Sequence, residues 1–113
     1  MEVFHATNYV ASSFDGPLVV TVHDLSFLRY PETHPPERIT WLAEGLPDTL
    51  RRAGRIIVDS RFIKDELISM LDVSTDSITV VYLGVGQDYK PRDNEVLAPK
   101  LREFDLRPKG YIL

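Results

Sequence analysis

The 113-residue sequence contains no cysteine. This absence excludes a disulfide scaffold and a thiolate zinc site, and it fits a reducing compartment. The sequence also lacks an apolar run near the roughly 20 residues of a membrane-spanning helix, and its start lacks the basic-then-apolar layout of a signal peptide. We therefore expect a cytoplasmic protein, with peripheral contact to a membrane face kept open as an alternative.

Positive charge is also scarce. Lysine and arginine together number 13 against 17 aspartates and glutamates, which gives a formal net charge of −4. Because phosphate backbones are bound mainly by clustered lysine and arginine, nucleic acid is not an expected partner. The length and the 43% hydrophobic content indicate an ordinary globular chain with one core.

The most informative stretch is the apolar run from Pro17 to Val22, which ends in His23 and Asp24. Its β-branched residues, uninterrupted by charge, predict a strand buried on both faces of a parallel sheet. Ligands bind outside the carboxyl ends of such strands, so His23 and Asp24 are candidate site residues. A hydrogen-bonded structural histidine and a turn or capping role for the aspartate are the competing interpretations.

Similar patterns predict further strands at 2–5, 55–59 and 78–82 and helices at 37–53 and 61–71. Pro47 interrupts the first helical pattern and predicts a kink or a break near Gly45. The prolines of segment 25–36 predict a long loop without regular structure, of a kind that is often functional. In the second helix, Glu66 and its charged neighbours are expected to face water.

Two further positions follow predicted strands. Ser60 is the expected N-cap of the second helix, and the free backbone N–H groups there make it a candidate anion site, although every strand–helix unit is built this way. The glycines on either side of Val85 give a weak phosphate-loop signal. After them the chain turns polar and is predicted to be a linker up to Pro99, followed by residues 100–105 that can form one short helix.

Six segments, in this order, resemble the second half of the N-terminal Rossmann-like domain of group 1 (family 4) retaining glycosyltransferases, which have the two-domain GT-B architecture. The segments are Val3–Tyr9, Val20–Phe27, Leu46–Ala53, Ile57–Phe62, Val80–Val85 and Lys109–Leu113. The resemblance implies an α/β fold: a partial Rossmann-like parallel sheet with flanking helices over residues 1–86. It further implies a linker over 87–109 and, over 110–113, the first strand of a C-terminal domain outside this sequence.

The resemblance also implies an activity. A sugar, with mannose as the candidate, would pass from a nucleotide-sugar donor to a glycan or other hydroxyl acceptor, with retention and without a metal or another cofactor. The family histidine matched by His23 lies near the transferred sugar, which makes His23 the candidate catalytic residue. The candidate acceptor- or sugar-binding residues are Asp24, Asn8, Gly84 and Val85. Because the family's C-terminal domain binds most of the donor, the 113-residue chain alone is expected to be inactive.

A second interpretation belongs to another class of protein. The chain would then be a non-catalytic α/β binding or self-association module that kept the fold and lost the chemistry. Exposed sheet edges would favour a homo-oligomer in that case. A third interpretation, another Rossmann-like enzyme such as an epimerase, is weaker because no glycine-rich dinucleotide loop follows a strand.

Overall fold

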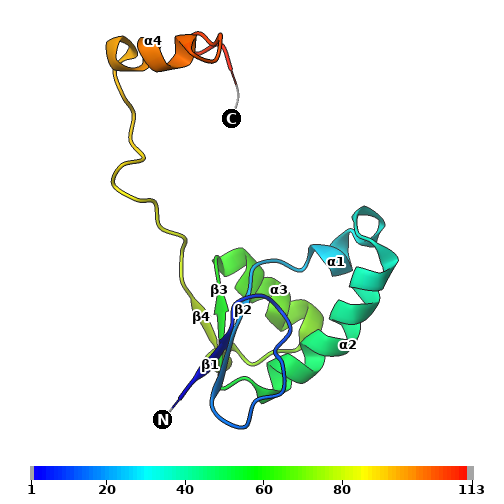
Figure 1. Cartoon of the computed structure of the whole chain (residues 1–113). Helices are drawn as coiled ribbons and strands as arrows, with labels where there is room; N and C mark the ends of the chain where they lie inside the picture. The colour runs from blue at the N-terminus through cyan, green and yellow to red at the C-terminus, as the bar shows by residue number, and fades with distance from the viewer. Residues whose placement is uncertain (1, 112–113) are drawn as a thin grey trace. The chain divides into compact units, whose positions relative to one another are not determined.

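A computed structural model describes residues 2–111 of the chain. Two compact units are present, one ending at Leu83 and the other beginning at Gly84 (Figure 1). The first unit holds four strands: β1 (Phe4–Ala6), β2 (Leu18–Val22), β3 (Arg55–Val58) and β4 (Ile78–Val80). They form one all-parallel sheet in the order β1-β2-β3-β4. The predicted α/β fold with a parallel sheet is therefore confirmed, and each strand begins and ends within two residues of its predicted bounds.

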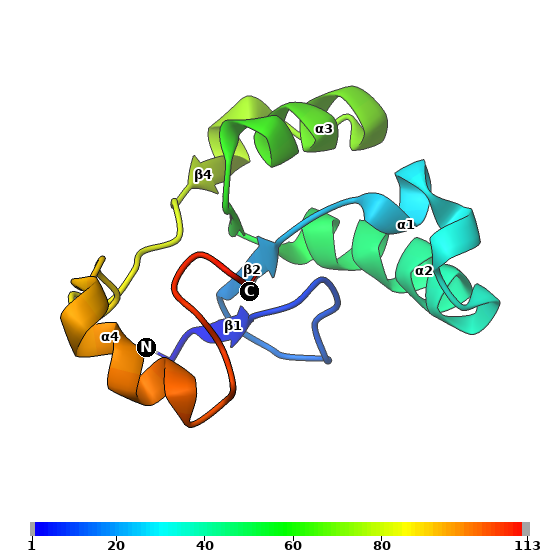
Figure 2. The same cartoon turned by 90° about the horizontal axis from the view of Figure 1, so that it is seen from above.

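Both long helices of the first unit cover the same face of this sheet. Helix α2 (Pro36–Arg52) connects β2 to β3, and α3 (Arg61–Leu71) connects β3 to β4. Because the strand order follows the chain and parallel crossovers are right-handed, the two helices must lie on one side (Figure 2). The core between the helices and the sheet includes Leu18, Val20, Val22, Ile56, Val58, Leu42, Leu46 and Leu67.

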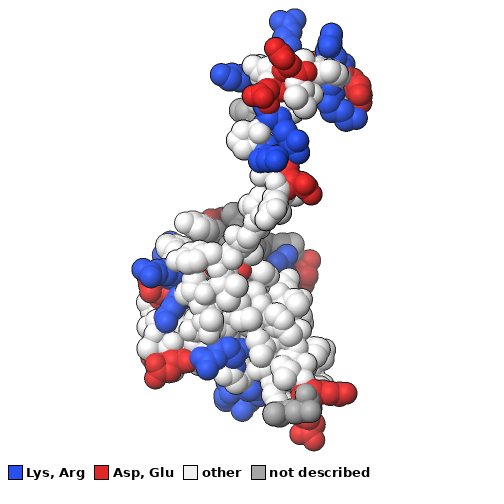
Figure 3. All heavy atoms as spheres, turned by 90° about the vertical axis from the view of Figure 1, so that its left-hand side faces the viewer, with Lys and Arg blue, Asp and Glu red and all other residues white. Residues whose placement is uncertain are grey.

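The second face of the sheet carries no helix from residues 2–83. By the alternation of strand side chains, His5, Val19, Ile57 and Thr79 point to this side. Figure 3 views the molecule from this direction and shows a broad surface of the first unit with few charged side chains. Within residues 2–83, the helices therefore flank the sheet on one side only.

The connection after β2 is more regular than predicted. It contains the short helix α1 (Ser26–Arg29) and a single 3₁₀ turn, η1 (Pro31–Thr33), and α2 already begins at Pro36. The expectation of a loop without regular structure was therefore wrong. The carboxylate of Asp24 starts α1 by accepting the backbone N–H of Ser26 at 2.8 Å. A proline fits the first position of α2 because that position needs no N–H donor.

Helix α2 runs through Pro47 without a break, so of the predicted kink or break near Gly45 the break was wrong and the kink stays a prediction. An interior proline costs a helix about 3 kcal/mol. Leu42 and Leu46, each 1% exposed, offset this cost because burying one leucine contributes about 1.5–3 kcal/mol. Gly45 is explained by packing, since a Cβ atom there would lie 2.8 Å from Cγ1 of Val10.

Helix α3 begins after Ser60 as predicted, and the Ser60 hydroxyl caps it by accepting the backbone N–H of Ile63 at 3.3 Å. The expected solvent position of Glu66 was wrong, because this residue is only 5% exposed. It forms an ion pair with Arg29 of α1, with 2.5 Å between Arg29 Nε and Glu66 Oε1. The side of α3 that carries Glu66 is therefore covered by the α1 segment.

The second unit contains one helix, α4 (Asn94–Arg102), in its described part. The predicted helix start at Lys100 was therefore wrong, because the helix begins six residues earlier, at Asn94; the assignment of 87–109 as a linker with a short helix stays a prediction. The carbonyl of Asp93 accepts the N–H groups of Val96 and Leu97, so the first turn forms ahead of the proline. Of the strand predicted at 110–113, the first two residues are not in a strand, and residues 112–113 lie outside the described part. No helix described here is long and apolar enough to cross a membrane.

Candidate functional site

His23 lies at the carboxyl edge of the sheet with both ring nitrogens engaged. Nδ1 is 2.7 Å from Oδ2 of Asp59, and Nε2 is 3.1 Å from the carbonyl oxygen of Thr7. Both partners are acceptors, so a protonated ring that donates from both nitrogens satisfies both contacts. The hydrogen bond to Asp59 raises the pKa of His23 against a smaller opposing effect of burial. The two acceptor contacts and the raised pKa both favour the protonated form of the imidazole, whose side chain is 44% exposed.

Asp59 is a site residue that the sequence analysis missed. The parallel register pairs Val22 with Val58, so the next residues of β2 and β3, His23 and Asp59, are neighbours across the sheet edge. The signal was available in the sequence, because His23 directly follows one predicted buried strand and Asp59 is the last residue of the next predicted strand. Pairing the two strand ends in register would have found it.

The His23–Asp59 pair predicts a dependence of stability on pH. A histidine pKa that is raised in the folded state stabilises the fold below about pH 6.5, and this contribution is lost as the pH rises through the folded-state pKa. Because the imidazole is nearly half exposed, we expect the loss to be about 1 kcal/mol or less. Urea unfolding at a series of pH values will measure it. The variant Asp59→Asn should flatten the curve in this range, and an unchanged curve would show that the pair contributes nothing.

A strained turn places Asn8 next to this histidine. Tyr9 has a φ of 54°, and the N–H of Val10 donates to the carbonyl of Asn8 at 2.8 Å, which closes a three-residue turn. A positive φ is strained for a bulky residue. The turn is held by the Tyr9 N–H, which donates to Thr21 of β2 at 3.1 Å, and by the carbonyl of Thr7, which binds the imidazole. Asn8 is exposed, so its amide is free to meet a ligand.

Asp24 performs a local structural function. Its Oδ1 accepts both the backbone N–H and the hydroxyl of Ser26, at 2.8 and 2.6 Å. The serine proton is thereby used, so the serine oxygen accepts a hydrogen bond from Nε2 of His34 at 2.9 Å. Burial raises the pKa of Asp24, but the hydrogen bonds from Ser26 and Tyr9 outweigh it and hold the pKa below its usual range. Burial of the Tyr9 side chain and its contact with the Asp24 carboxylate raise the pKa of Tyr9.

The remaining predicted positions are spread over both units. Ser60 directly follows Asp59 and uses its hydroxyl as the cap of α3, so its role as an anion site stays a prediction. Gly84 and Val85 belong to the second unit; Val85 is 75% exposed, and a Cβ on Gly84 would meet no atom within 4 Å. Their sugar-binding role stays a prediction as well.

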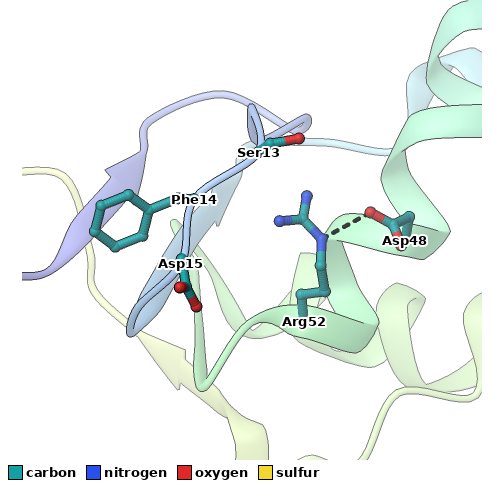
Figure 4. A pocket seen from close by; sticks show the side chains of 5 residues that line it. All are labelled: Ser13, Phe14, Asp15, Asp48 and Arg52. Carbon is teal, nitrogen blue, oxygen red and sulfur yellow. Dashed lines mark hydrogen bonds and ion pairs between the residues drawn. The ribbon is translucent and has the colours of Figure 1, made fainter.

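A hollow lies at the amino edge of the sheet, opposite the carboxyl edge that carries His23. Its volume is about 610 Å³, and it is lined by Ser13, Phe14 and Asp15 of the β1–β2 loop and by Asp48 and Arg52 of α2 (Figure 4). The guanidinium of Arg52 already donates to Asp48 at 2.7 Å and to the carbonyl of Ala11 at 3.2 Å. Since the cation is used within the fold, we assign no ligand to this hollow.

Aspartate, glutamate and histidine side chains are the candidate metal ligands of this cysteine-free chain. Within residues 2–111, no three of these side chains gather closely enough to hold an ion. Both ring nitrogens of His23 already contact Asp59 and Thr7. The metal independence implied by the family resemblance stays a prediction.

Comparison with known proteins identifies the family. The family model described as Glycosyltransferase Family 4 matches residues 2–89, a range that includes all four strands and His23. The chain is also 30% identical over 111 residues to the O-antigen chain mannosyltransferase B of Escherichia coli. That match covers 98% of this chain and 29% of the relative, so the chain spans less than a third of the relative's length. From the extent of the family match, the chain belongs to glycosyltransferase family 4.

Proposed function

We propose that this chain is the acceptor-side part of a retaining glycosyltransferase that transfers a hexose, with mannose as the candidate, from a nucleotide sugar to a glycan hydroxyl. Membership of the family supports glycosyl transfer, and the name of the Escherichia coli relative supports mannose. The observation that carries the proposal is the half-exposed imidazole of His23, held by Asp59 at the sheet edge where parallel α/β folds bind ligands.

In this proposal, His23 has a defined part in the reaction. The Nε2–H contact with the Thr7 carbonyl is 3.1 Å long, so a sugar hydroxyl or phosphate oxygen can compete for this proton. In the transfer, the bond between the anomeric carbon and the phosphate oxygen breaks, a bond from the anomeric carbon to the acceptor oxygen forms, and the proton of the acceptor hydroxyl leaves with the diphosphate. Negative charge develops on the leaving diphosphate, and a fixed cation nearby lowers the energy of that state. Asp59 keeps the imidazole cationic and oriented.

The acceptor would meet the residues around this histidine. The exposed amide of Asn8 can both donate to and accept from sugar hydroxyls. We retain Asp24, Gly84 and Val85 as acceptor- or sugar-binding candidates and Ser60 as the anion candidate. We propose that the nucleotide-sugar donor is bound mainly by residues beyond these 113, and the 29% coverage of the relative supports this division.

Location and assembly belong to the same proposal. The absence of cysteine supports the cytoplasm as the compartment. Peripheral membrane contact stays a prediction. Self-association through sheet edges also stays a prediction; β1 is an edge strand whose outer side has no partner strand among residues 2–111.

The purified 113-residue chain is expected to transfer no sugar, because in this proposal most contacts to the nucleotide-sugar donor come from residues beyond these 113. The test incubates the chain, and separately the complete product of its reading frame, with radiolabelled nucleotide hexoses and a glycan acceptor. If the 113-residue chain alone makes labelled glycan, the proposal that the donor is bound mainly by residues beyond these 113 is wrong. If a longer product of the frame also makes none with any donor of the panel, the transferase proposal is wrong.

A further inference from the structure

A small cavity lies between the α1 segment and the start of α3. Its volume is about 160 Å³, and the residues that line it include Asp24, Ser26, Arg29, Tyr30, Phe62 and Glu66. Asp24 follows β2, and Phe62 lies in the first turn after β3, so the cavity opens at the same carboxyl edge of the sheet as His23. It is smaller than the roughly 300–1,000 Å³ of pockets for drug-sized ligands, which limits its occupant to about one ring.

Two aromatic side chains at this cavity expose more than half of their surface to water, which is unfavourable for large apolar rings. Tyr30 is 52% exposed and Phe62 is 57% exposed. The guanidinium of Arg29 lies 5.3 Å from the centroid of the Phe62 ring, so this ring is held in place. The C–H faces of pyranose rings stack on aromatic rings, and a stacked sugar would remove this apolar surface from water.

The polar side chains at the cavity match hydroxyl groups. Glu66 is 5% exposed, and its Oε1 contacts Arg29 Nε but has no hydrogen-bond partner of good geometry among the described residues. A carboxylate offers about four acceptor positions, so this buried group retains unused capacity. Asp24 is a second carboxylate in the lining.

The charge balance selects between ligand classes. Two carboxylates, Asp24 and Glu66, face one cation, Arg29, so the lining is acidic overall. A phosphate or a nucleotide would be repelled by this arrangement, whereas a neutral polyol can donate hydroxyl protons to both carboxylates. Aromatic surface together with carboxylate acceptors therefore favours a neutral sugar.

We propose that this cavity binds one neutral hexopyranose unit of the acceptor glycan, beside the unit that receives the transferred sugar. The inference rests on the proposed function and names the substrate class for its acceptor side. Asp24 lines the cavity, whereas the ring of His23 contacts Asp59 and Thr7 and does not line it. The cavity thus holds the glycan next to the reaction centre and leaves the imidazole to the reacting groups.

Binding can be measured on the 113-residue chain itself. The ¹⁵N-labelled chain is titrated with methyl α-D-mannopyranoside and with a mannose disaccharide while amide chemical shifts are recorded. We expect saturable shifts concentrated in residues 24–30 and 61–66. Tyr30→Ala and Phe62→Ala should each weaken binding by up to about tenfold, the effect of losing one aromatic contact. Both residues are more than half exposed, so the variants should keep the dispersed spectrum of the folded chain.

Trp41→Ala is the matched control. Trp41 is an exposed aromatic residue of α2, 55% accessible, and it does not line the cavity. This variant should bind the saccharides as the parent chain does. Shifts centred elsewhere, no saturable shifts with either saccharide, or equal affinities in all three variants would overturn the inference.

A separate readout distinguishes this inference from the proposed function. If the saccharides bind at the cavity while the complete gene product transfers no sugar, the proposed function fails and the sugar site stands. If the complete product transfers sugar but Tyr30→Ala and Phe62→Ala leave the KM for the acceptor glycan unchanged, the cavity assignment fails and the proposed function stands.

Discussion

Replacing Arg29 with methionine is expected to lower the free energy of unfolding by about 2–3 kcal/mol. The variant leaves Glu66 5% exposed and without its cation. Breaking one partner of a fully buried ion pair costs about 3–5 kcal/mol. We expect less because the Arg29 side chain is 46% exposed, so water can reach part of the vacated space. Urea unfolding monitored by circular dichroism will measure the change.

The double variant Arg29→Met/Glu66→Met separates the charge from the packing. Removing both charges should recover most of the loss, since replacing a buried ion pair with apolar residues is often neutral or stabilising. Arg51→Met is the matched control, because Arg51 pairs with Asp48 at the surface and its side chain is 74% exposed. Its cost should stay below about 0.5 kcal/mol. If the single and double variants at Arg29 were equally unstable, the stranded carboxylate would not be the cause.

The ion pair also marks where sequence reasoning reached its limit. Strands β2 and β3 and the capped start of α3 were predictable because continuous apolar runs and an N-cap serine are local signals. The burial of Glu66 was not predictable in this way, because it depends on Arg29, which lies 37 positions earlier and reaches α3 only in the folded chain. Helical periodicity treats every charged residue as solvent-facing, and here a partner on another element reverses the outcome.

At the candidate site, too, local sequence signals were predictable and contacts between distant elements were not. His23 was predicted from its place after a buried strand, while its partner Asp59 required the register between two strands. The strained φ of Tyr9 has no signal in residue type, because a tyrosine in this conformation is set by the contacts around it. The sequence therefore predicted the edge of the sheet that carries the candidate site, and only the packed structure supplied the contacts that orient its side chains.

The largest effect on activity is expected for His23→Ala in the complete product of the reading frame. Loss of one preorganised donor at a site of developing negative charge costs about 10²–10³ in kcat. The assay follows label transfer from the nucleotide sugar to the glycan, with unfolding measured in parallel. His5→Gln is the control histidine, because His5 is exposed and binds Thr21 along the sheet rather than at its carboxyl edge. It should change kcat by less than about threefold, since a surface substitution of this kind is usually mild.

The variant Asp59→Asn distinguishes a cationic role of His23 from a purely structural one. Asp59 is the main cause of the raised pKa of His23, so its neutral isostere should bring that pKa back toward the ordinary value. If the imidazolium stabilises the leaving group, activity of Asp59→Asn should fall with rising pH earlier than activity of the parent enzyme. A structural role would instead lower kcat by the same factor at every pH. The position of the alkaline limb, compared at equal fractions of folded protein, therefore decides whether Asp59 serves the reaction through the charge of His23.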